Sequence, residues 1–301
     1  GRYYTETVYE DNRFVVYKNP HSFPLAYGTN SLVKNIQFGA NNAFANQNII
    51  LNSMEGHQKA KNDTIEYFKP LAFNAIETEN VIEEKVNKET GEAIYKRADS
   101  SKDAIIRYKV TPRTNYTYYF FTPVSLIQNQ DYSVLLNNKW LLNAKIFTQR
   151  QIWQLTDQTE NQETVIEFRF RTDHIDMSNA GVYRADVDQI QQVLENRKKQ
   201  GLHVTKFSNT HIVGDVSITD DSNYMMTSIP YSDGWKVKVD GKFVQTSKAW
   251  NAFLAFPISK GNHKVEFVFR QKGVILGALL SIVSITYLVI QMRRSRSNEG
   301  R

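Results

Sequence analysis

The chain has 301 residues, no cysteine and a formal net charge of +6. The lack of cysteine excludes disulfides and thiolate metal sites. Four arginines and one glutamate lie in residues 292–301, so the preceding residues hold 33 basic against 30 acidic side chains. A surface so nearly balanced does not favour nucleic acid as a partner.

Residues 1–60 are predicted to be a membrane-proximal lead-in with one helix. Apolar side chains lie along one side of the stretch from Asn42 to Glu55, and Gly56 stands where a helix C-cap is expected. The first residues lack the apolar core of a signal peptide. We therefore expect the chain to be the end of a longer, multi-pass membrane protein whose earlier helices fix its topology.

Residues 61–175 are predicted to form a first β-sandwich or jelly-roll-like domain. Short alternating runs, rich in β-branched and aromatic residues, recur between turn residues. These runs are IEYF, AIIRYKV, YTYYFF, YSVLL, IWQL and TVIEFRF. Residues 77–103 interrupt them with a charge-dense stretch, which is predicted to be a long solvated hairpin.

Residues 176–202 are predicted to be a linker built on an amphipathic helix. Asp186 can cap this helix, its last turn is basic, and Gly201 ends it. We expect the helix to join two β domains.

Residues 203–273 are predicted to form a second β-sandwich domain. In its segment WKVKVDGKFV, tryptophan and valine alternate inward, and Asp240-Gly241 supplies the positive φ angles of a two-residue hairpin turn.

The two β domains have similar sequences at two places. DYSVLLNNKW at 131–140 lines up with GWKVKVDGKF at 234–243, and TVIEFRF at 164–170 lines up with HKVEFVF at 263–269. Either two similar sandwiches in tandem or one duplicated fold follows from this repeat.

Residues 274–291 are predicted to be a transmembrane helix. The run VILGALLSIVSITYLVI carries no charge, and as a helix it covers roughly 25 Å. Residues 292–301 are a basic tail, which the positive-inside rule places in the cytoplasm, so residues 1–273 are expected to be extracytoplasmic. The alternative, a buried helix of a soluble protein, is disfavoured because such a helix seldom lacks a polar face.

The predicted fold is therefore mainly β. It has two tandem β-sandwich or jelly-roll-like domains joined by an amphipathic helix and followed by one transmembrane helix. The expected location is the cell membrane, with the lipid bilayer as a partner.

Several short motifs gather in the last third of the chain and near its start. They are Pro230-Tyr231, Gly234-Trp235, Val239-Asp240-Gly241, Gly261-Asn262-His263, the pair Gly273 and Gly277, and FVVYKNPHSFPLAYG at 14–28. With these motifs the chain resembles the C-terminal extracytoplasmic region of the YfhO family of bacterial multi-pass membrane proteins. It departs from the family at Phe269-Arg270-Gln271, where Tyr-x-Pro is expected.

The resemblance implies a GT-C-type glycosyltransferase of the Gram-positive cell envelope. Such an enzyme takes a sugar from a polyprenyl-phosphate carrier and transfers it to a cell-wall polymer such as lipoteichoic acid. Its catalytic carboxylate lies in the first outer loop, so no catalytic residue, metal or cofactor is expected within these residues. This region is expected to position the acceptor or to stabilise the membrane core.

Two other functions are compatible with the sequence. One is a non-enzymatic carbohydrate-binding or adhesion module on a membrane anchor. The other is a soluble hydrolase domain held at the membrane, for which no acid pair or metal site is visible. No nucleophile elbow is present and the six histidines are scattered, which favours structural roles for them.

Aromatic rings beside amides are the side chains that bind sugars most readily. On this ground the candidate sugar contacts are Tyr231, Trp235, Trp250 and Asn251. Trp235 continues an inward alternation, which favours a core position. Trp250 follows a polar loop, which favours an exposed one, although it could equally brace the sheet on the membrane.

Overall fold

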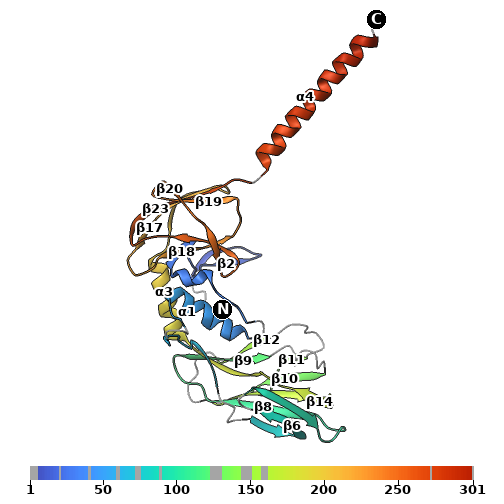
Figure 1. The fold of residues 1–301 in the computed structure, drawn as a ribbon. Helices are drawn as coiled ribbons and strands as arrows, with labels where there is room; N and C mark the ends of the chain where they lie inside the picture. Colours follow the sequence, from blue (N-terminus) through green and yellow to red (C-terminus); the bar gives the residue numbers. More distant parts are fainter. Residues whose placement is uncertain are drawn as a thin grey trace. The chain divides into compact units, whose positions relative to one another are not determined.

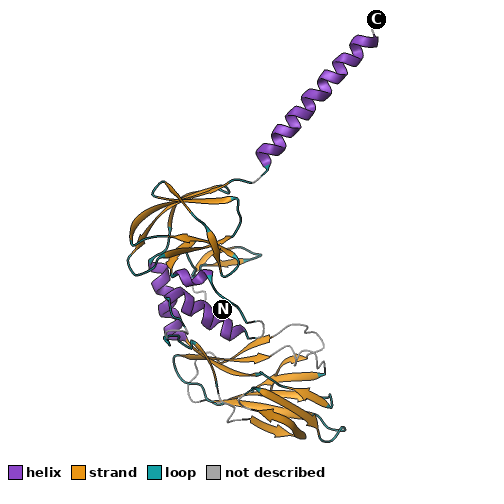
Figure 2. Ribbon diagram, viewed as in Figure 1, coloured by secondary structure: helices purple, strands orange, loops and turns teal. Residues whose placement is uncertain are grey.

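The computed structural model describes residues 6–19, 22–39, 42–58, 62–71, 76–87, 90–122, 131–143, 151–156, 162–271 and 273–299. In these ranges strands predominate over helices (Figure 2), so the mainly β class predicted from the sequence is confirmed. The chain forms two compact units. The central unit is Asn35–Arg197, and the terminal unit is Gly1–Lys34 together with Lys198–Arg301.

The central unit contains three antiparallel sheets. Their strand orders are β11-β10-β13-β8-β5, β12-β9-β15-β4 and β14-β7-β6. Figure 1 shows the sheet of β9 and β12 stacked on the sheet of β10 and β8. The elements are α1 (Ala43–Glu55), β4 (Phe68–Pro70), β5 (Ile76–Glu79), β6 (Val81–Asn87), β7 (Glu92–Arg97), β8 (Ala104–Val110), β9 (Tyr116–Thr122), β10 (Tyr132–Leu136), β11 (Lys139–Asn143), β12 (Gln151–Thr156), β13 (Thr164–Phe170), β14 (His174–Asp176), β15 (Gly181–Asp186) and α3 (Val187–Lys199).

The core of the central unit lies between its larger sheets. Ile106 and Phe168 reach it from the five-stranded sheet, and Phe120 reaches it from the four-stranded sheet. All three side chains are fully buried. Alternate residues of β8 are buried, as expected of a strand with one face on a core.

The two helices near the ends of the central unit are capped, and Gly56 and Asp186 hold the capping positions that the sequence predicts. Asn42 accepts hydrogen bonds from two backbone N–H groups at the start of α1, and Gly56 ends that helix with φ 89°. Asp186 accepts from the backbone N–H of Gln189 at the start of α3. A buried ion pair joins the helices, with Arg197 Nε 3.0 Å from Glu55 Oε1.

The terminal unit has two larger antiparallel sheets, ordered β16-β17-β23-β19-β20 and β21-β22-β18-β3. Strand β3 comes from the predicted lead-in and pairs with β18, about 200 residues later in the chain. The elements are β1 (Thr7–Glu10), β2 (Val15–Tyr17), β3 (Ala26–Thr29), the 3-10 helix η1 (Ser31–Lys34), β16 (His203–Phe207), β17 (His211–Ile218), β18 (Tyr224–Pro230), β19 (Trp235–Val239), β20 (Lys242–Val244), β21 (Ser247–Ala249), β22 (Phe253–Pro257), β23 (Gly261–Phe269) and α4 (Val274–Glu299).

The two five-stranded sheets follow the same strand order. β11, β10, β13, β8 and β5 of one correspond to β20, β19, β23, β17 and β16 of the other. The β10–β11 hairpin turns on Asn137 and Asn138, with φ 48° and 63°, and the β19–β20 hairpin turns on Asp240 and Gly241, with φ 51° and 79°. The repeat seen in the sequence is therefore a repeat of the fold.

The repeat also keeps one acidic side chain on the middle strand of each five-stranded sheet. Glu167 on β13 accepts hydrogen bonds from Arg107 and Arg169, each at 2.5 Å. Glu266 on β23 lies 3.0 Å from Lys238 Nζ and 2.9 Å from His211 Nε2. Glu167 therefore binds one arginine of its own strand and one of β8, whereas Glu266 binds basic side chains of both neighbouring strands.

Helix α4 carries large apolar side chains that are exposed in the structure. Leu280, Val283 and Ile285 keep 60%, 65% and 61% of their surface accessible. Over the described residues, no helix meets the length and hydropathy required of a membrane span. The transmembrane helix predicted at 274–291 therefore stays a prediction.

Candidate functional site

The four predicted sugar contacts all lie in the terminal unit, on two different sheets. Tyr231 follows β18 and Trp235 begins β19, and both are half-buried against the core of the unit. The Trp235 ring lies 5.1 Å from the ring of Phe269. Trp235 therefore packs in part as a core residue, as its place in the alternation predicts.

Trp250 and Asn251 are the two central residues of the β21–β22 turn. Their φ angles are 48° and 58°, and Ala252 N donates to the Ala249 carbonyl at 3.0 Å. A left-handed φ is tolerated by asparagine but is an outlier for tryptophan. Trp250 is half-buried, and its backbone N–H donates to the Val33 carbonyl at 2.9 Å, which helps to hold it there.

Tyr231 lies beside the same turn. Its backbone N–H donates to the Ala252 carbonyl at 2.8 Å, and Lys248 Nζ lies 5.3 Å from the centre of its ring. The fold thus brings Tyr231, Lys248, Trp250 and Asn251 to one end of the four-stranded sheet, here called the tip cluster. Trp235 lies on the five-stranded sheet and is not part of it. Rings, an amide and an ammonium together suit a ligand with many hydroxyl groups.

Asp240, Ser259 and His263 come together in a way that the sequence did not reveal. His263 Nδ1 lies 2.8 Å from Asp240 Oδ2, and Nε2 lies 3.3 Å from Ser259 Oγ and 3.0 Å from the Ser259 carbonyl oxygen. The His263 hydrogen bond, followed by that of the Lys264 backbone N–H, holds the pKa of Asp240 below its usual range.

This arrangement does not suit nucleophilic catalysis. His263 Nδ1 faces the Asp240 carboxylate, and Nε2 lies closer to the Ser259 carbonyl oxygen than to the Ser259 hydroxyl. A general base would need a free lone pair directed at the serine hydroxyl. The hydrogen bonds among these three residues instead hold the loop before β23 against the β19–β20 turn. Within the described ranges, no group of three His, Asp or Glu side chains is placed to hold a metal ion.

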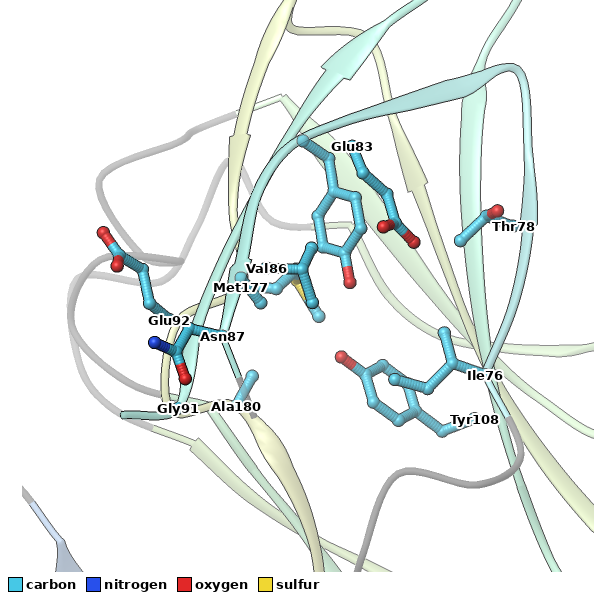
Figure 3. Close-up of a pocket in the computed structure, with 12 residues that line it drawn as sticks. Ile76, Thr78, Glu83, Val86, Asn87, Gly91, Glu92, Tyr108, Met177 and Ala180 are labelled. Atoms are coloured by element: carbon cyan, nitrogen blue, oxygen red, sulfur yellow. The ribbon is translucent and has the colours of Figure 1, made fainter. Parts of the chain in front are cut away.

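A cavity of about 210 Å³ lies in the central unit, where sequence reasoning expected a solvated hairpin. Its walls come from β5, β6, β7, β8 and the loop after β14. In Figure 3 the Tyr108 hydroxyl points inward and the Glu83 carboxylate lies on the far side of the same space. Tyr95 also lines the cavity. The hairpin β6–β7 thus forms one wall of the cavity, and the lining residues Glu83 and Val86 of β6 are exposed to solvent.

The two tyrosines of the cavity are buried, with 3% and 4% of their surfaces exposed for Tyr95 and Tyr108. Burial, and to a smaller extent the charge of Glu83, raises the pKa of Tyr95. Burial also raises the pKa of Tyr108, with a smaller contribution from Tyr95. Both phenols therefore stay protonated at neutral pH and can donate hydrogen bonds.

A family model with the description "Bacterial membrane protein YfhO" matches residues 2–281. The chain belongs to the YfhO family. The resemblance carried by its motifs is thereby confirmed. In Bacillus subtilis (strain 168), a protein named "Uncharacterized protein YfhO" is 24% identical over 121 residues. That match covers 40% of this chain and 14% of the B. subtilis protein, so this YfhO chain spans a small part of its relative's length.

Solved structures give weaker similarities to this YfhO chain. A β-glucuronidase of Ruminococcus gnavus matches with a TM-score of 0.26 and 7% identity, over 67% of this chain and 44% of that one. A glycosyl hydrolase family 2 member from Bacteroides cellulosilyticus matches with a TM-score of 0.27 and 8% identity, over 68% and 32%. Similarities of this size carry no information on function.

Proposed function

We propose that this chain is the C-terminal extracytoplasmic region, with the last membrane helix, of a membrane glycosyltransferase. The enzyme would transfer a sugar from a polyprenyl-phosphate carrier to a cell-wall polymer such as lipoteichoic acid. The observation that carries the proposal is membership of the YfhO family of bacterial membrane proteins over residues 2–281. The catalytic groups would lie outside these residues, and the two β units would hold the acceptor.

Helix α4 supports a place in the membrane. Its first 17 residues carry no charge, and the large apolar side chains described along it are exposed. Exposure of such side chains to water is unfavourable by about 25 cal/mol for each Å². Arg293 and Arg294 follow at once. A bilayer around 274–291 would cover the apolar surface and retain these arginines in the cytoplasm.

Cysteine labelling of the full-length protein on intact cells tests this topology. The chain has no cysteine, so each substitution adds one site to the background of the unsubstituted protein. A membrane-impermeant maleimide is expected to label Lys260→Cys on intact cells and Ser297→Cys only after permeabilisation. Equal labelling of both positions from outside would contradict a spanning α4.

The tip cluster is the proposed acceptor contact of the terminal unit. Trp250 is held in a left-handed conformation that its side chain disfavours, and such positions tend to be kept where they serve binding. Trp250 and Asn251 form the end of a hairpin, where Trp250 is half-buried and Asn251 is exposed. An extended polymer can reach a hairpin end without passing through a cavity.

Trp250→Asn is expected to raise the KM for the acceptor polymer roughly three- to tenfold and to change kcat less than twofold. Asparagine accepts the same left-handed backbone, and loss of a stacking ring removes on the order of 1 kcal/mol of binding. The measurement is sugar transfer in membranes containing the full-length protein at varied acceptor concentration. Trp140→Asn, at an exposed tryptophan on β11 of the central unit, is the control. Identical KM values for Trp250→Asn and the unsubstituted protein would exclude the tip cluster as a contact.

A further inference from the structure

The cavity of the central unit combines apolar walls with inward polar groups. Ile76, Val86 and Met177 supply apolar surface, while Tyr95, Tyr108 and Glu83 supply two hydroxyls and a carboxylate. Tyr95 is 3% exposed and lines the cavity. A polar group at a buried site is stabilised when a ligand or a water supplies its partner.

The size of the cavity limits what can enter it. A volume of about 210 Å³ holds roughly seven waters. This is the scale of one sugar ring, and it is too small for a polymer segment or a lipid chain. Glu83 and Val86 belong to the exposed strand β6, so the space is reached from solvent at the β6 side.

Charge limits the ligand further. The two acidic side chains that line the cavity are Glu83 and Glu92, and no basic side chain lines it among the described residues. Glu92 lies 2.6 Å from Lys85 Nζ, and in Figure 3 its carboxylate points away from the space. The Glu83 carboxylate is therefore the charged group that faces the cavity. It would accept hydrogen bonds from hydroxyl or ammonium groups and repel an anion.

We propose that this cavity is a sugar subsite that takes one ring carrying hydroxyl groups and no negative charge. The ring would place its C–H faces on the apolar walls, donate hydroxyls to Glu83 and exchange hydrogen bonds with Tyr95 and Tyr108. The assignment rests on the proposed function in one respect, the choice of a glycan as ligand. It is separate from the tip cluster, which lies in the other unit.

Saturation-transfer NMR on the purified full-length protein in detergent micelles tests the subsite. The probes are glucose, glucosamine and glucuronate. Glucose and glucosamine are expected to give saturable signals, and glucuronate none. Tyr95→Phe, which keeps the ring and removes the hydroxyl, is expected to weaken glucose binding about tenfold. Glu83→Gln is expected to weaken glucosamine most and to allow glucuronate to bind.

Tyr132→Phe is the matched control, because Tyr132 is buried in the same core without lining the cavity. Melting temperatures confirm that each variant is folded. No saturable sugar signal, or signals that do not change in Tyr95→Phe or Glu83→Gln, would show that the cavity is not a sugar subsite. Equal binding of glucuronate would contradict the proposed selection against negative charge. This experiment measures sugar binding and not sugar transfer, so its result does not depend on whether the protein is a transferase. Trp250→Asn tests the tip cluster alone.

Discussion

Phe168→Ala is expected to lower the free energy of unfolding of the central unit by about 3–5 kcal/mol. Phe168 is fully buried on β13, the middle strand of its sheet. Its ring centre lies 4.9 Å from that of Phe120 and 5.9 Å from that of Trp153. Alanine would leave a cavity between the two sheets. The sheets cannot close this cavity, because moving together would break the hydrogen bonds between their strands.

Thermal unfolding of the full-length protein in micelles measures this effect. A fall of about 10 °C in the transition of the central unit is expected for a unit of this size. Phe243→Ala is the control, because Phe243 is 69% exposed, and it is expected to change that transition little. A fall of less than 2 °C in Phe168→Ala would mean that the two sheets do not share one core.

Glu167→Ala is expected to lower the free energy of unfolding by about 3 kcal/mol. The side chain of Glu167 is 7% exposed and lies between Arg107 and Arg169. Its loss would leave two guanidinium groups without their carboxylate at a partly buried site. Because both arginines keep some exposure to solvent, the expected loss of stability is at the lower end of the roughly 3–5 kcal/mol found for broken buried ion pairs. Glu79→Ala removes an exposed partner of the same Arg107 and is expected to have little effect. Equal losses in the two variants would contradict a special role for the buried carboxylate.

Glu167 also makes the stability of the central unit depend on pH. Burial alone raises the pKa of Glu167, but hydrogen bonds from Arg169 and Arg107 outweigh it, so the folded pKa lies below the ordinary 4.5. A depressed folded pKa gives a stabilisation that is complete above about 4.5 and is lost as the pH falls through the folded value. The difference in melting temperature between Glu167→Gln and the unsubstituted protein should therefore narrow as the pH falls below about 4.5. A gap that stays constant from pH 7 to 3 would contradict this.

Much of the fold could be predicted because it depends on local patterns. The alternation of AIIRYKV coincides with β8, and Gly56 ends α1 as the predicted C-cap. The turn at Asp240-Gly241 follows from backbone preference alone. The alignment of TVIEFRF with HKVEFVF also placed Glu167 and Glu266 at the same position of two related strands.

Other features depend on contacts between distant residues. The pairing of β3 with β18 joins the lead-in to the terminal unit, and no pattern within residues 26–29 indicates it. The run IEYF predicted a strand at 65–68, whereas β4 begins at Phe68. The approach of Ser259 and Asp240 to His263 likewise depends on a loop and a turn from different strands.

The candidate sites divide in the same way. Tyr231, Trp250 and Asn251 were found as aromatic and amide residues, and the fold brings them together at one hairpin. The cavity was missed because residues 77–103 are rich in charge and suggested only a solvated hairpin. The sequence signal for the cavity was Tyr95, a buried aromatic residue in the segment EAIYKR. The second tyrosine of the cavity, Tyr108, lies on a different sheet, so the sequence did not indicate that the two residues meet.

The most direct test of the account measures donor binding and sugar transfer to the wall polymer in membranes. The full-length protein is compared with a version that lacks residues 1–273 and keeps the upstream helices and the last helix. Loss of sugar transfer to the wall polymer is expected, with binding of the polyprenyl-phosphate donor retained and normal insertion of the truncated protein. Undiminished transfer to the polymer would show that the β units do not hold the acceptor, and loss of donor binding as well would show that the membrane core depends on them.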